Sequence, residues 1–214
     1  MPVLDNDECA VLPCRRGLMV DRKPTMPANA QRLDFHLDAA PYDPALRLFF
    51  ALWPPPALRA TIAQHALLWG FEPPVRSTVP DKLHLTVLFM DSVPAARLQD
   101  VVRFGAKIAS EAKPFRLQLD HAEIWPQGGI AHLAPSHVPG ELTALRVALA
   151  REAQKAGIPC DVRPFKPHVT LARRAQARLA PEGFAPILWH AADLCLVRSV
   201  LGTGRYAVLA RWTL

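Results

Sequence analysis

Two tetrapeptides of alternating character constrain the fold of this chain most: His84-Leu85-Thr86-Val87 and His168-Val169-Thr170-Leu171. In a β-strand, alternate residues share a face. Each tetrapeptide therefore predicts a strand that carries an imidazole and a hydroxyl on one face and buries aliphatic side chains on the other. The two motifs are separated by 84 residues, about the length of one small lobe.

The repetition of the motif predicts a site in which two histidines oppose each other across a cleft. The competing interpretation is that both are ordinary strand histidines, hydrogen-bonded in a core. Lys82 and Lys166 precede His84 and His168 by two residues, and in an unbroken strand they share their faces. Because lysines are rarely buried, this pattern favours solvent-facing histidines.

The order of the expected elements is that of a chain with two similar halves. Apolar periodicity and turn residues predict strands at 47–53, 83–89, 115–125, 130–133, 165–172 and 205–214, with one or two more strands within 187–201, and helices at 57–70, 94–112 and 141–156. This order predicts an α+β fold of two pseudo-symmetric lobes, each an antiparallel-rich sheet backed by helices, with a central cleft.

The first 44 residues differ in character from the rest of the chain. They contain scattered prolines and charges and have no sustained apolar period. We therefore expect residues 1–44 to form an irregular N-terminal extension and residues 45–214 to form the bilobal domain.

Composition limits the class of protein and of partner. Lys plus Arg is 25 against 19 for Asp plus Glu, a net charge of +6 that suits an anionic ligand such as a nucleic acid end, although it equally serves solubility. No apolar stretch approaches a membrane span, and the N-terminus has no secretory pattern. The four cysteines lack disulfide or zinc spacing. These features predict a cytoplasmic protein with reduced thiols and no membrane partner, and nothing demands more than a monomer.

Paired histidines and threonines suit the opening of a cyclic phosphodiester. Water must lose a proton as it attacks phosphorus, and the leaving ribose oxygen must gain one; histidine suits both tasks because its pKa lies near neutrality. Hydroxyl donors and a cation can hold the charge on the phosphate oxygens. The sequence has no His, Asp and Glu cluster with convincing ligand spacing, so we expect catalysis without a metal or other cofactor.

Two longer segments around the motifs, Leu83–Phe89 and Arg163–Arg173, resemble the signature segments of the 2H phosphoesterase superfamily. More narrowly, they resemble its RNA 2′,3′-cyclic phosphodiesterase branch, the 2′-5′ RNA ligase-like proteins. Arg47–Leu52 is similar to the first strand of that branch. The resemblance covers about residues 45–214.

The resemblance implies hydrolysis of an RNA-terminal 2′,3′-cyclic phosphate to a 2′-phosphomonoester. It implies that His84 is the general acid and His168 the general base, and that Thr86, Thr170 and Arg173 bind the phosphate. The implied partners are RNA ends or nucleotides that carry a cyclic phosphate.

Some residue roles have a second interpretation. Strict alternation puts Arg173 on the face opposite His168, so phosphate binding requires a bend after Leu171; without one, Arg173 is a solvated residue at a strand end. Phe49 or Phe165 could stack on the terminal base, but a place in the core is the more usual role of a phenylalanine.

Three other functions fit the same motifs: hydrolysis of a small-molecule nucleotide cyclic phosphate, reversible 2′-5′ RNA ligation, and a non-catalytic module that binds RNA ends. The basic net charge favours RNA over a small molecule. The two intact histidines favour catalysis over binding alone.

Overall fold

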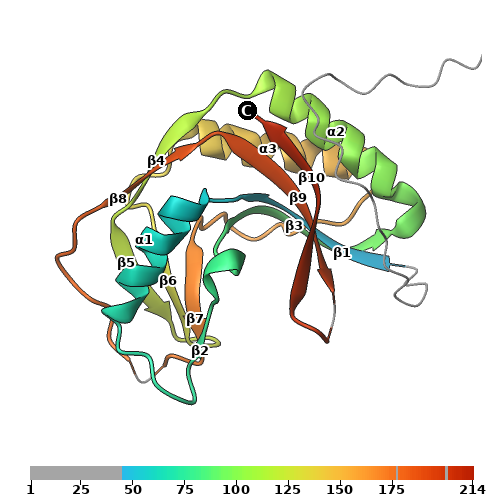
Figure 1. Cartoon of the computed structure of the whole chain (residues 1–214). Helices are drawn as coiled ribbons and strands as arrows, with labels where there is room; N and C mark the ends of the chain where they lie inside the picture. Colours follow the sequence, from blue (N-terminus) through green and yellow to red (C-terminus); the bar gives the residue numbers. More distant parts are fainter. Residues whose placement is uncertain (1–44, 177, 201) are drawn as a thin grey trace, which may run out of the picture.

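A computed structural model describes residues 45–176, 178–200 and 202–214, so the predicted N-terminal extension lies outside the described residues. Eight strands form one sheet in the order β10-β9-β1-β3-β7-β6-β5, with β2 paired to β7, and each pairing is antiparallel (Figure 1). The strands are β1 (Ala45–Leu52), β2 (Arg76–Ser77), β3 (Leu85–Pro94), β5 (His121–Trp125), β6 (Ile130–Ala134), β7 (Val169–Arg173), β9 (Asp193–Val200) and β10 (Arg205–Thr213).

Three helices and a two-stranded sheet complete the described part of the chain. The helices are α1 (Pro56–Leu67), α2 (Leu98–Glu111) and α3 (Gly140–Lys155), and the small sheet pairs β4 (Phe115–Leu119) with β8 (Ile187–Ala191). Helices α2 and α3 cover the half of the main sheet that contains β3, β9 and β10, whereas α1 packs against β8 beside the other half (Figure 1). The predicted α+β class is confirmed.

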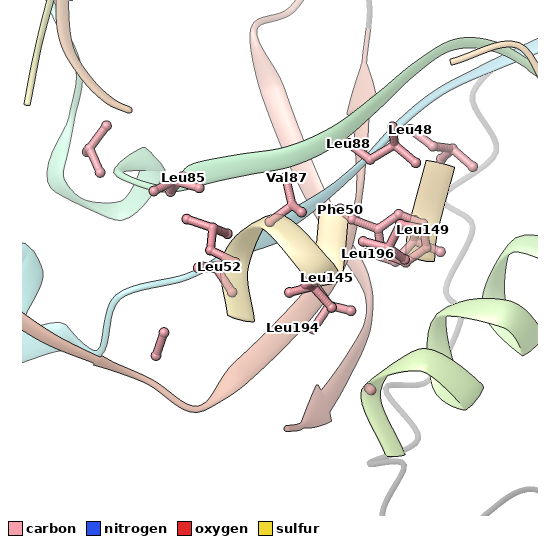
Figure 2. Packing of buried hydrophobic residues seen from close by; sticks show 14 of the residues in the cluster. Leu48, Phe50, Leu52, Leu85, Val87, Leu88, Leu145, Leu149, Leu194 and Leu196 are labelled. Carbon is pink, nitrogen blue, oxygen red and sulfur yellow. The ribbon is translucent and has the colours of Figure 1, made fainter. Parts of the chain in front are cut away.

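The core lies between the main sheet and the helices. Leu145 and Leu149 of α3 lie among Phe50, Leu194 and Leu196 of the strands (Figure 2). One hydrophobic cluster runs through both halves, so the strands that carry the two motifs pack against the same core. Among the described residues, no helix is long and apolar enough to cross a membrane.

The expected single strand at 115–125 was wrong, because the chain changes sheets at Asp120. Its carboxylate accepts hydrogen bonds from the backbone N–H of Ser136 at 2.7 Å and from the Ser136 hydroxyl at 2.6 Å. The break leaves β4 paired with β8 and β5 paired with β6. A short polar residue that bonds to backbone is a strong turn former, which apolar periodicity alone does not register.

The motif strands also begin later than predicted. Lys82 ends a short 3₁₀ helix, Pro80–Lys82, and β7 begins only at Val169 because the segment before it contains Pro167, which has no N–H for the sheet. The interpretation that each lysine shares a strand face with its histidine was therefore wrong. Instead, the backbone of each lysine contacts the histidine that follows it.

Candidate active site

The two motifs are brought together by the pairing of β3 with β7. Leu85 and Val169 are direct antiparallel partners, and each follows its motif histidine. Extending this register by one residue in both directions sets His84 beside Thr170 and Thr86 beside His168. The motifs are thus related by an approximate two-fold axis at the residue pair that joins β3 to β7 in the described part of the chain.

The four motif side chains share one face, and the aliphatic residues occupy the other. Leu85, Val87, Val169 and Leu171 are at most 2% exposed. By contrast, the two histidines and the two threonines are half-buried and reach solvent. The two faces are therefore as the alternation predicted.

Both histidines are held in the same tautomer by their own backbone. The Nδ1 atom of His84 lies 2.6 Å from the carbonyl oxygen of Lys82, and that of His168 lies 2.8 Å from the carbonyl oxygen of Lys166. A carbonyl oxygen can only accept, so Nδ1 carries the hydrogen in each ring. This leaves both Nε2 atoms free to exchange a proton with a ligand.

His84 sits among aromatic rings. Its ring stacks on Trp53 with a centroid distance of 5.1 Å and an interplanar angle of 10°, and on Phe49 at 5.0 Å. Tyr206 meets it edge-on at 5.4 Å. Burial among these groups is the main cause that lowers the pKa of His84 to about 4, and the nearby His168 contributes to the same shift, so the two histidines lie within electrostatic range.

His168 sits in a different environment. Trp125 meets its ring edge-on at 4.5 Å and His132 does so at 5.4 Å. Burial lowers the pKa of His168 to about 4, and the neighbouring His132 disfavours its charged form as well. One histidine thus has aromatic neighbours and the other has an aromatic and a second imidazole.

His132 and Glu123 extend the surroundings of His168, and the sequence assigned no role to either. His132 is 1% exposed, and its Nε2 lies 3.6 Å from a carboxylate oxygen of Glu123. That carboxylate also accepts a hydrogen bond from Trp125 Nε1 at 3.2 Å. Both residues belong to the β5–β6 hairpin, and their proximity to His168 depends on β6 pairing with β7, which motif spacing does not reveal.

A β-bulge turns Arg173 towards the face of the histidines. On β6, His132 and Ala131 are consecutive, but their partners Thr170 and Ala172 on β7 are two residues apart, so Leu171 is the extra residue. Leu171 and Ala172 are consecutive buried residues, as a bulge requires. Alternation resumes one residue later, so Arg173 shares the face of Thr170. This is the bend that phosphate binding by Arg173 requires, and the charge of Arg173 lowers the pKa of both motif histidines.

The strand β3 carries the equivalent bulge. Phe50 and Ala51 of β1 are consecutive, whereas their partners Leu88 and Thr86 are two residues apart, so Val87 is the extra residue. Phe89 therefore occupies the position in the first motif that Arg173 occupies in the second. The pseudo-symmetry extends beyond the histidines to the local irregularity of the backbone.

The two phenylalanines considered for base stacking belong to packed clusters. Phe49 is 3% exposed and its ring contacts His84, which leaves no free face for a base. Phe165 packs against the main hydrophobic cluster and lies 5.7 Å below the guanidinium carbon of Arg146. The more usual role, as part of the core, fits both residues.

Among residues 45–176, 178–200 and 202–214, no three His, Cys, Asp or Glu side chains gather as they would to hold a metal ion. Two cavities of about 360 and 330 Å³ lie away from the motif quartet, which is the two histidines and two threonines of the His-x-Thr motifs. One lies between α2 and α3 and the other beside Phe89 and Arg163.

The fold and the site define the class: an α+β protein with two His-x-Thr motifs paired across one sheet. The chain belongs to the 2′-5′ RNA ligase superfamily, whose family model matches residues 53–201. It is 31% identical over 185 residues to an RNA 2′,3′-cyclic phosphodiesterase of Thermus thermophilus, covering 79% of this chain and 90% of that protein. It is 33% identical over 175 residues to the protein of the same name from Escherichia coli, covering 78% and 96%.

Solved structures agree with these relatives. The chain is similar to E. coli LigT in complex with 3′-AMP, with a TM-score of 0.67 and 29% identity over 79% of this chain and 98% of that one. It is similar to E. coli LigT in complex with NADP⁺ with a TM-score of 0.66 and 28% identity over the same shares. Both structures are of the same E. coli protein, which binds these nucleotides on a fold of this kind.

Proposed function

We propose that this protein hydrolyses RNA-terminal 2′,3′-cyclic phosphates to 2′-phosphomonoesters, by acid–base catalysis with two histidines and without a metal. The observation that carries the proposal is the antiparallel pairing of the two His-x-Thr motifs around Leu85 and Val169. It supplies two free Nε2 atoms and two hydroxyls on one solvent-facing surface. The names of the relatives support the substrate class.

His84 acts as the general acid. The faces of Trp53 and Phe49 against its ring favour the imidazolium through cation–π attraction, once a bound anion supplies the charge that offsets desolvation. In the reaction the bond between phosphorus and the ribose 3′ oxygen breaks. The proton on Nε2 of His84 passes to that leaving oxygen.

His168 acts as the general base. Its neighbour His132 disfavours a proton on His168, which keeps Nε2 available as an acceptor. Nε2 takes a proton from water as the water oxygen forms its bond to phosphorus. The product keeps the phosphate on the 2′ oxygen, and the two histidines end with their protonation states exchanged.

Thr86, Thr170 and Arg173 stabilise the charge on the non-bridging phosphate oxygens. By register, each threonine is the cross-strand neighbour of the opposite histidine, so both hydroxyls face the phosphorus centre. Arg173 lies on the same face because of the bulge at Leu171. Donors fixed before the reaction need no reorganisation during it, which makes them effective.

The test is product analysis on a short RNA with a 2′,3′-cyclic phosphate end, in the presence of a chelator. We expect conversion to the 2′-phosphate, identified against 2′- and 3′-phosphate standards. Untouched substrate, a 3′-phosphate product or a strict need for metal contradicts the proposal. The control is the double variant His84→Ala, His168→Ala, which should retain RNA binding and lose turnover.

The same experiment separates the other functions. Equal rates on RNA ends and on nucleoside cyclic phosphates indicate a small-molecule enzyme, and joining to a 5′-hydroxyl RNA indicates ligation. Binding without turnover indicates a non-catalytic module. The proposal includes a monomer in the cytoplasm, which sedimentation and cell fractionation can check.

A further inference from the structure

Arg76 stands directly beside Arg173 at the edge of the main sheet. The short strand β2 pairs with the end of β7, and its register makes Arg76 and Arg173 direct antiparallel partners (Figure 1). Directly opposed residues point to the same face of a sheet. The sequence did not single out Arg76, because eight residues separate it from the first motif histidine.

The shared face of the two arginines is that of the histidines. The bulge at Leu171 brings Arg173 to the side on which Thr170 points, so its partner Arg76 points there too. The backbone N–H of Thr78 donates to the carbonyl oxygen of Leu171 at 2.7 Å, which continues the same register past the bulge. Arg76 therefore borders the same surface as the motif quartet.

The two guanidinium groups have no protein counter-ion within the described part of the chain. Neither Arg76 nor Arg173 has an ion pair or a side-chain hydrogen bond there. The carboxylates of the two neighbouring loops already form ion pairs elsewhere. Glu72 pairs with Arg178 at 2.9 Å, and Asp81 pairs with another arginine. Like charges directly opposite each other destabilise a strand pair, so an anion from outside would relieve this arrangement.

The positions of the two arginines relative to Thr170 indicate which negative charge of a ligand each one can bind. Arg173 follows Thr170 by three residues, or about 10 Å of strand, and its long side chain can span part of that length. Arg76 lies one strand further out, at a neighbour spacing of about 5 Å. Arg173 is thus the nearer cation to the reacting phosphate, and Arg76 is the cation for the next negative charge along the ligand.

We propose that Arg76, with Arg173 beside it, binds the phosphodiester that joins the terminal nucleotide to its upstream neighbour. This inference rests on the proposed function and adds a basis for choosing RNA ends over nucleoside 2′,3′-cyclic phosphates. A phosphate accepts bidentate hydrogen bonds from guanidinium groups, which makes a pair of arginines a specific receptor.

The test compares adenosine 2′,3′-cyclic phosphate with the dinucleotide ApA that ends in a 2′,3′-cyclic phosphate. The wild type should prefer the dinucleotide in kcat/KM. The substitution Arg76→Met should lower that preference about tenfold, mainly through KM, because a charge-assisted contact to the substrate is lost. It should also reduce the salt dependence of kcat/KM on the dinucleotide by roughly 0.7 in logarithmic slope.

Two further variants make the result specific. Arg116→Met removes another exposed arginine, from β4 in the small sheet, and should leave the preference unchanged. Arg76→Lys keeps the charge and should retain part of the preference, which excludes misfolding as the cause.

The outcomes separate the two proposals. If neither substrate reacts with the wild type, the proposed function fails. If both react and Arg76→Met leaves the preference intact, or lowers both rates equally, the inference about Arg76 is wrong and the proposed function stands.

Discussion

The pH dependence of the reaction tests the two-histidine mechanism most directly. In the free protein, burial lowers the pKa of both His84 and His168 to about 4. At neutral pH both rings are then neutral, and only about one molecule in a thousand carries a proton on either one. The mechanism needs a protonated His84 beside a neutral His168, so the proton must enter with the substrate.

A bound phosphate supplies the driving force. One negative charge about 5 Å from an imidazolium, at an effective dielectric constant of about 20, contributes roughly 3 kcal/mol, or about 2.4 pH units. This would raise the pKa of His84 from about 4 towards neutrality in the complex. The aromatic faces of Trp53 and Phe49 then favour the charged ring over the uncharged one.

The expected result is a difference between two kinetic profiles. Because kcat/KM reports the free enzyme, it should rise as the pH falls from 8 to 5, by up to about tenfold per unit. Because kcat reports the complex, it should level off near neutrality. Initial rates at constant ionic strength, with chelator present, give both profiles, and calorimetry in two buffers measures proton uptake when inorganic phosphate binds. A kcat/KM that is flat or falls from pH 7 to pH 5, with no proton uptake, refutes the reasoning.

Three further predictions concern catalysis and stability. His84→Ala or His168→Ala should each lower kcat/KM by at least about 10²-fold, and retained activity in either variant contradicts its role. The free energy of unfolding should decrease as pH falls from 6.5 towards 4, by at most roughly 3 kcal/mol per motif histidine. The reason is that these histidines bind protons at a higher pH in the unfolded chain than in the folded protein. Urea titrations should therefore find a smaller loss of stability at low pH in the alanine variants. Gly105→Ala should destabilise the protein by about 1–3 kcal/mol in urea despite the better helix propensity, because the added methyl would lie 2.7 Å from the ring of Phe50 and 2.9 Å from that of Trp212; an equal or higher stability contradicts this packing.

Alternation and element order predicted what depends on local sequence. Two-residue periodicity was sufficient to assign His84 and Thr86 to one face and Leu85 to the other, because side-chain direction in a strand follows from the backbone alone. The helices at 57–70 and 141–156 were also found to within a few residues, since their apolar spacing and terminal glycines are local signals.

Long-range pairing explains what could not be predicted. The turn at Asp120 depends on Ser136, and the contact of His132 with His168 depends on the pairing of β6 with β7. Neither partner is near in sequence, so no local pattern reports it. The side on which Arg173 points was equally inaccessible, because a bulge is defined by the neighbouring strand rather than by the strand that carries it.

In the proposed mechanism, the environments around the histidines, rather than the motifs, decide which ring acts as the acid and which as the base. The motifs are nearly identical, and their register, their Nδ1 contacts and even their bulges repeat. A symmetric pair would share one proton equally and give no direction to the reaction. Burial lowers the pKa of both rings to about 4 in the free protein. Once a phosphate is bound, cation–π attraction to Trp53 favours the charged form of His84, whereas His132 beside His168 opposes a charge there. Replacing this imidazole by an aromatic ring, as in His132→Phe, should raise the pKa of His168. It should reduce kcat more than it reduces the affinity for the substrate. An unchanged kcat in that variant would mean that the direction of proton transfer comes from the substrate alone.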